Sequence, residues 1–120
     1  MKLLNVIFWM AIALVSPVMA QAEMELFKIT AYCSCKKCCG KSDGITASGK
    51  QAKNGYVACN WMQFGTKLTI DGKPYIVMDR GAKSQFGDNE HHIKHIDIWM
   101  PSHKEALNHG VKWQKVEVVK

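Results

Sequence analysis

Two aspartates interrupt or end apolar segments and could act as acids. Asp97 lies between Ile96 and Ile98 in "HIDIW", and Asp79 ends "YIVMD". A carboxyl group shielded from water has a raised pKa, stays protonated near neutral pH and can serve as a general acid. The alternative is structural, because most aspartates at strand ends cap a turn or pair with a lysine. Asp79 and Asp97 are therefore candidate catalytic residues, with the structural role left open.

The cysteines are a second chemical feature. Four of the five are packed into "CSCKKCC", and the candidates for disulfides are Cys33, Cys35, Cys38, Cys39 and Cys59. Export to an oxidising compartment favours disulfides, and we expect one bond from the cluster to Cys59, whose cluster partner the sequence does not identify. The spacing C-x-C-x-x-C-C differs from that of a paired zinc knuckle. We therefore expect no metal site, with zinc bound by the cysteines as the alternative.

The histidines form no recognisable metal motif. His91, His92 and His95 fall in "HHIKH", which leads into a strand rather than a helix, and no HExxH sequence is present. We interpret this stretch as a polar, solvated loop.

The start of the chain is typical of an exported protein. Lys2 precedes an apolar run over 6–15, and Ala20 and Ala22 are plausible cleavage points. This pattern predicts a signal peptide over 1–22 and one domain over 23–120, with an uncleaved anchor as the alternative. Loss of Lys2 lowers the formal charge from +6 to +5. A basic exported protein (periplasmic, at the cell wall or outer membrane face, or secreted) is drawn to anionic polymers.

Short strands and long loops dominate the rest of the sequence. Alternating apolar and β-branched segments predict strands over 25–32, 56–59, 66–70, 74–79, 95–100 and 111–119. Asp71 and Gly72 fit a hairpin turn. One short helix is predicted within 101–110, with Ser102 and Glu105 as a capping box and Gly110 at its end. With so little helix we predict an all-β fold, a small closed six-stranded barrel.

Several motifs in a fixed order resemble the three-aspartate (3D) domain of bacterial cell-wall proteins. They span about residues 27–119 and read "ITAYCSCKKCCGKSDGITASGK", "VAC" with "FGTKLTI", "YIVMDRG", "HIDIWM" and "ALNHGVKWQKVEVV". The resemblance implies a double-psi β-barrel, similar to the catalytic barrel of membrane-bound lytic transglycosylase A. It implies cleavage of the β-1,4 bond between N-acetylmuramic acid and N-acetylglucosamine in peptidoglycan.

The same resemblance assigns roles to residues. Asp97 would be the catalytic acid, kept dry by Ile96, Ile98 and Trp99, and Asp79 its neighbour in the cleft. The substrate-binding candidates are Thr30, Tyr32, Lys50, Asn60 and Trp99.

Three departures from the family pattern stand out. Asn60 occupies the place of the usual third aspartate, and an amide cannot ionise. The loop "DRGAKSQFGDNEHHIKHID" is longer and richer in histidine than in the family. Arg80 follows Asp79 where a small residue is usual.

The leading interpretation is a lytic transglycosylase that leaves 1,6-anhydromuramoyl ends. One alternative is hydrolysis with Asp79 as the second carboxylate. Another is a non-catalytic, expansin-like wall-binding barrel in which Tyr32, Trp61 and Trp99 stack on glycan strands. A third is a small zinc-binding exported protein. We expect peptidoglycan glycan strands as the partner, no cofactor, a monomer, no stable membrane insertion, and no nucleic acid, because no nucleic-acid-binding motif is present.

Overall fold

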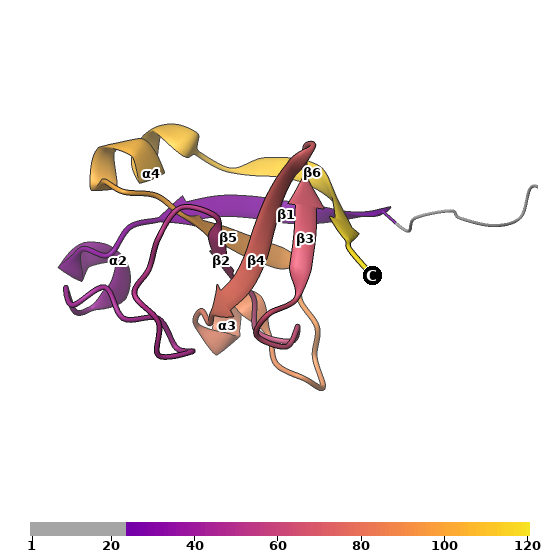
Figure 1. The fold of residues 1–120 in the computed structure, drawn as a ribbon, viewed down its shortest axis with the longest axis horizontal. Helices are drawn as coiled ribbons and strands as arrows, with labels where there is room; N and C mark the ends of the chain where they lie inside the picture. The colour runs from indigo at the N-terminus through magenta and orange to yellow at the C-terminus, as the bar shows by residue number, and fades with distance from the viewer. Residues whose placement is uncertain (1–23) are drawn as a thin grey trace, which may run out of the picture.

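The computed structural model describes residues 24–120 as a small β-barrel (Figure 1). The predicted signal peptide, 1–22, lies outside the described residues. Six strands close the barrel in the order β1-β5-β2-β4-β3-β6. They are β1 (Met24–Tyr32), β2 (Tyr56–Ala58), β3 (Lys67–Ile70), β4 (Lys73–Asp79), β5 (His95–Trp99) and β6 (Lys112–Val118).

The strand order has an internal two-fold symmetry. The pairs β1–β5 and β2–β4 are parallel, and the other four pairs are antiparallel. If β1 is exchanged with β4, β2 with β5 and β3 with β6, the barrel keeps the same pairs of neighbouring strands. The parallel and antiparallel pairs also stay the same. Two interlocked halves of this kind form a double-psi barrel. The predicted six-stranded all-β barrel is confirmed.

Strand β5 shows how the barrel separates core from site. Side chains alternate between the two faces of a strand. Ile96 and Ile98 belong to the buried hydrophobic core, so His95, Asp97 and Trp99 face the other way. The expectation that Ile96 and Ile98 keep Asp97 dry is therefore wrong, because they lie on the opposite face of the strand.

The local turn and cap signals are confirmed. Asp71 and Gly72 both have positive φ angles, 52° and 77°, as a two-residue hairpin turn requires. Helix α4 (His103–His109) begins after Ser102, whose hydroxyl accepts the backbone N–H of Glu105 at 3.2 Å. Gly110 ends the helix with a φ of 68°.

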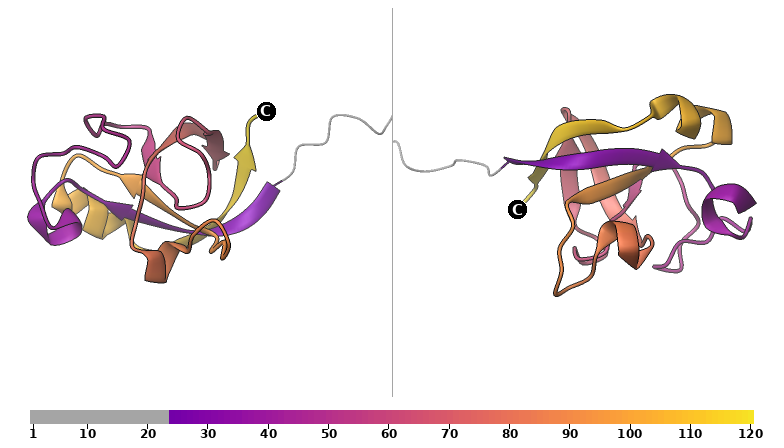
Figure 2. Two further views of the ribbon diagram at one scale, coloured as in Figure 1. Left: turned by 90° about the horizontal axis from the view of Figure 1, so that it is seen from below. Right: turned by 180° about the vertical axis from the view of Figure 1, so that it is seen from behind.

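Two further helices, each of four residues, lie in segments predicted as loops. They are α2 (Lys36–Cys39) and α3 (Lys83–Phe86). A single helical turn is too short to show a 3.6-residue period, so sequence patterns could not reveal it. Helices α2 and α4 lie at the same end of the barrel (Figures 1 and 2). Within residues 24–120, no helix has the length and apolar character needed to cross a membrane.

Candidate active site

Four adjacent strands place the two aspartates in one row. In the ladder Thr30 pairs with Asp97, Asp97 pairs with Ala58, and Ala58 pairs with Asp79. Residues directly opposite each other present their side chains on the same face. The two aspartates are thus two strand spacings apart, about 9–10 Å between Cα atoms. Ala58 lies between them, and its single methyl group leaves the space between the carboxyl groups open.

Both aspartates line a cleft of about 490 Å³. That volume is within the range of small-molecule sites, roughly 300–1,000 Å³. Its walls also include Tyr32, Lys41, Thr46, Ala58, Arg80 and Phe86. The cleft is therefore built from the ends of β1, β2 and β4, the middle of β5, helix α2 with the loop after it, and the segment around α3.

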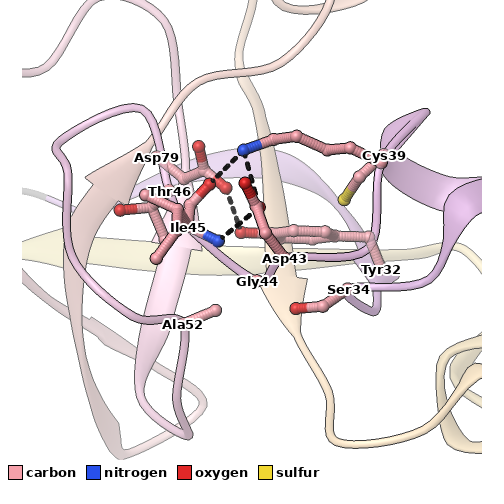
Figure 3. Close-up of a pocket in the computed structure, with 10 residues that line it drawn as sticks. Tyr32, Ser34, Cys39, Asp43, Gly44, Ile45, Thr46, Ala52 and Asp79 are labelled. Carbon is pink, nitrogen blue, oxygen red and sulfur yellow. Dashed lines mark hydrogen bonds and ion pairs between the residues drawn. The ribbon is translucent and has the colours of Figure 1, made fainter.

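Asp79 serves as a hydrogen-bond acceptor in this cleft. Its carboxylate accepts the Tyr32 hydroxyl at 2.6 Å, the Ala47 backbone N–H at 2.8 Å and the Arg80 backbone N–H at 2.9 Å. Figure 3 shows the Tyr32 hydroxyl pointing to the Asp79 carboxylate. Burial, and then the bond to Asp79, raise the pKa of Tyr32. The phenol therefore remains a donor, and both Asp79 oxygens are occupied.

Asp97, in contrast to the acceptor Asp79, is a candidate proton donor. Its pKa is raised to about 6, chiefly by burial and to a smaller extent by the charge of Asp79, while the hydrogen bond from Thr30 acts in the opposite direction. That bond, from the Thr30 hydroxyl to Oδ1 at 2.9 Å, joins it to a neighbouring side chain. Two carboxyl groups with different surroundings can divide acid and acceptor roles between them. Asp97 is the member of the pair suited to carry a proton in weakly acidic solution, up to about pH 6.

A chain of hydrogen bonds connects Asp97 through Thr30 and His95 to the backbone of Gln85. The Thr30 hydroxyl lies 2.8 Å from His95 Nε2, and His95 Nδ1 lies 3.2 Å from the Gln85 carbonyl oxygen. The Phe86 ring stacks on the His95 imidazole at 4.0 Å between centroids. Burial is the main cause that lowers the pKa of His95, which favours the neutral ring.

A neutral His95 favours one arrangement of protons in this chain. With Nδ1–H donating to the Gln85 carbonyl, Nε2 must accept, so the Thr30 hydroxyl donates to it. The Thr30 hydroxyl, which donates to Asp97 Oδ1 when the carboxyl is ionised, then offers Asp97 only a lone pair, and a protonated Asp97 can donate to it. Every group in the chain has a partner when Asp97 is protonated. Ionisation of Asp97 forces the Thr30 hydroxyl to turn and the imidazole to change its protonation.

Asn60 holds the segment that supplies one wall of the cleft. Its Nδ2 donates to the carbonyls of Gly81 at 3.0 Å and Gly87 at 2.8 Å, and its Oδ1 accepts the Gly81 N–H at 2.7 Å. Asn60 thus positions this loop, whereas it was expected to contact substrate. An aspartate could accept the one N–H but could not donate to the two carbonyls.

Two other predicted substrate contacts are placed elsewhere. Lys50 is exposed, and its backbone groups bond to Thr46. Lys41 is the lysine that lines the cleft, with its ammonium 2.9 Å from Asp43. Trp99 donates its indole N–H to the Ser34 hydroxyl at 2.8 Å, which ties it to the loop after β1.

The expected aromatic stacking surface is not assembled. Trp61 stacks on His92, with ring centroids 4.2 Å apart, and donates its N–H to the Ile93 carbonyl. Of the three aromatic residues considered for glycan stacking, Tyr32 lines the cleft.

His95, Ala58 and Ala47 also belong to the site, although they were not among the predicted site residues. His95 is two residues before Asp97, so strand alternation alone could have placed both side chains on one face. Ala58 and Ala47 contribute a small side chain and a backbone N–H, which carry no sequence signal of function.

The expected disulfide between the cysteine cluster and Cys59 is absent from the described residues. All five lie within residues 24–120 and carry free thiols, so the predicted disulfide to Cys59 is not formed. Cys59 is fully buried in the barrel core, whereas the Sγ atoms of Cys33, Cys35 and Cys38 gather around His103 at the end of the barrel.

The raised pKa of Asp97 predicts a pH-dependent cost to stability. A carboxyl whose pKa rises on folding binds its proton more tightly in the folded chain, so folding stability falls as pH increases from about 4 to about 6. Asp97→Asn removes this ionisation. As pH rises from about 4 to about 6, the parent should lose stability that Asp97→Asn keeps. The free energy of unfolding of the variant minus that of the parent should therefore grow by up to about 3 kcal/mol. Urea unfolding at pH 4 and pH 7.5 measures the difference, and a gap that is equal at both pH values contradicts the prediction.

Comparisons with known proteins do not add to this picture: no family model matches the chain, and no curated protein matches it. The resemblance to the 3D domain therefore stays a prediction.

Proposed function

We propose that this protein is an exported enzyme that cleaves the β-1,4 bond between N-acetylmuramic acid and N-acetylglucosamine in peptidoglycan. The observation that carries the proposal is the contrast between Asp97 and Asp79 in one open cleft. One carboxyl has its pKa raised to about 6, and the other is an acceptor with three donated hydrogen bonds. The basic charge of the chain suits an anionic polymer.

In the proposed reaction Asp97 acts first as acid and then as base. Protonated Asp97 donates to the glycosidic oxygen as the bond to C1 breaks, and positive charge develops on the sugar ring. The Asp97 carboxylate then takes the proton from the C6 hydroxyl of the muramoyl residue, whose oxygen bonds to C1. The product is a 1,6-anhydro ring, no water is consumed, and Asp97 regains its proton. Asp79 provides negative charge near the developing cation.

Thr30 and His95 act as positioning residues in this scheme. The Thr30 hydroxyl can accept from protonated Asp97 and donate to ionised Asp97 without moving its oxygen. His95 is held by the Phe86 ring and the Gln85 carbonyl. Asp97 therefore keeps its hydrogen bond to Thr30 in both protonation states during one turnover.

A transglycosylase suits this cleft better than a hydrolase. An inverting hydrolase needs a second carboxylate that removes a proton from water. Both oxygens of Asp79 already accept hydrogen bonds from Tyr32, Ala47 and Arg80, so this group has little free capacity to act as that base.

The test is digestion of purified sacculi, followed by mass analysis of the released muropeptides. We expect ends that are one water lighter than hydrolytic ends, and activity that declines as pH rises through about 6. Hydrolytic ends would instead select the hydrolase. Sedimentation with sacculi without any release would select the expansin-like, wall-binding alternative.

A further inference from the structure

Three thiols and one imidazole converge at the end of the barrel where α2 and α4 lie. Cys33 follows β1, Cys35 precedes α2, Cys38 lies within α2, and His103 begins α4. The distances from His103 Nδ1 to the three sulfur atoms are 3.6, 3.4 and 3.5 Å, in that order. Cys33 Sγ and Cys38 Sγ are 3.6 Å apart, and all four ligand atoms lie within 4.8 Å of one another.

These distances fit the edges of a zinc coordination tetrahedron. With Zn–S bonds of about 2.3 Å and Zn–N bonds of about 2.0–2.1 Å, tetrahedral geometry gives S···N edges of about 3.5–3.6 Å and S···S edges of about 3.8 Å. The three observed S···N distances are within about 0.2 Å of that value. A disulfide would instead require two sulfur atoms at about 2.05 Å.

We propose that Cys33, Cys35, Cys38 and His103 bind one Zn²⁺ in a closed, structural site. Three thiolates and an imidazole are a ligand set typical of structural zinc, whereas magnesium, calcium and manganese prefer oxygen ligands. With four protein ligands the ion has no open position for substrate. This inference does not depend on the proposed glycan cleavage.

The two remaining cysteines are excluded as ligands by their contacts. Cys39 points its thiol at the Cys33 carbonyl oxygen, 3.2 Å away. Cys59 is enclosed in the barrel core. The odd number of cysteines, which a disulfide framework leaves unexplained, follows naturally from three ligands, one buried thiol and one exposed thiol.

The backbone around the cluster is arranged for ligation. The N–H groups of Cys38 and Cys39 both donate to the Cys35 carbonyl, at 3.2 and 3.0 Å, which folds the chain into the turn that brings Cys35 and Cys38 together. Gly40 ends this turn with a φ of 75°. The fourth ligand comes from α4, which packs against β1 (Figure 1).

The metal would stabilise the molecule by linking distant segments. His103 is 65 to 70 residues from the three cysteines. A bond network that closes a loop of this length removes substantial conformational freedom from the unfolded chain. Zinc would thereby fasten α2, which together with the loop after it forms one wall of the cleft, to the end of the barrel.

The first experiment measures metal in the full chain, exported with its own residues 1–22 and purified without chelator. We expect one zinc per chain, and replacement by Co²⁺ should give the visible absorption of a tetrahedral thiolate complex. Zinc should also protect Cys33, Cys35 and Cys38 from alkylation while the exposed Cys39 reacts. Substoichiometric zinc, or a disulfide between any two of the three proposed ligands, would overturn the proposal.

Matched variants locate the ligands. His103→Asn should weaken Co²⁺ and Zn²⁺ binding roughly 100-fold or more, whereas His109→Asn, on the same helix, should bind as the parent does. Cys35→Ser and Cys39→Ser form an equivalent pair, which keeps the test decisive should the histidine variant fold poorly. Equal metal affinity within both pairs would show that these residues are not ligands.

Discussion

Asp97→Asn is expected to lower the release of anhydro-muropeptides from purified sacculi by about 10²–10⁴-fold, the usual contribution of general acid–base catalysis. Asparagine has nearly the same shape, and its amide can keep the 2.9 Å contact with the Thr30 hydroxyl, donating through Nδ2 or accepting through Oδ1. What the variant lacks is the proton for the leaving oxygen and the base for the C6 hydroxyl. The loss should therefore appear in turnover, with binding to sacculi preserved.

The matched control is Asp71→Asn, which changes an aspartate in the β3–β4 hairpin turn, where asparagine also tolerates the positive φ. We expect it to digest sacculi at the parent rate. An Asp97→Asn protein that releases anhydro-muropeptides as fast as the Asp71→Asn control would remove Asp97 from the mechanism, and the cleavage proposal in its present form with it.

Asn60→Asp is the second change for which we expect a large effect, here on stability. It introduces the aspartate that the 3D-domain pattern would place at this position. In this barrel the new carboxylate would lose both donated hydrogen bonds and face the carbonyl oxygens of Gly81 and Gly87. Leaving these two carbonyls, of half-buried Gly81 and buried Gly87, unpaired beside a negative charge should cost about 2–3 kcal/mol. The melting temperature should fall by roughly 10–20 °C.

Thermal unfolding followed by circular dichroism measures this change, with Asn54→Asp in an exposed turn as the control for the added charge. Because the loop forms one wall of the cleft, we also expect Asn60→Asp to lose activity below its melting temperature. An Asn60→Asp protein as stable as Asn54→Asp would mean that the amide does not hold the loop.

Local sequence signals predicted much of the fold. Alternating apolar residues marked the six strands within about two residues of their ends, and the Asp71–Gly72 turn and the Ser102 cap followed from backbone chemistry. These features depend on residues close together in the chain, so a single sequence contains the information. The closed barrel then followed from many short strands and little helix.

The arrangement of the site could not be derived in that way. The row from Thr30 through Asp97 and Ala58 to Asp79 depends on the register between strands that are distant in sequence. The contact of Asn60 with Gly81 and Gly87 depends on the path of a loop, and so does the convergence of the three cysteines on His103. In each case the sequence supplied candidate residue types, and only the tertiary pairing determined their partners.

The interlocked strand order has a consequence for how the chain reaches its native state. Strand β1 pairs only with β5 and β6, and β4 pairs with β2 and β3. Neither half of the sequence can therefore complete its own hydrogen-bond ladders, and the Thr30–Asp97 contact spans 67 residues. Such a high contact order favours slow, late folding. The row from Thr30 to Asp79 and the cysteine–histidine cluster both join the first half to the second, so neither can form until almost the entire chain is present.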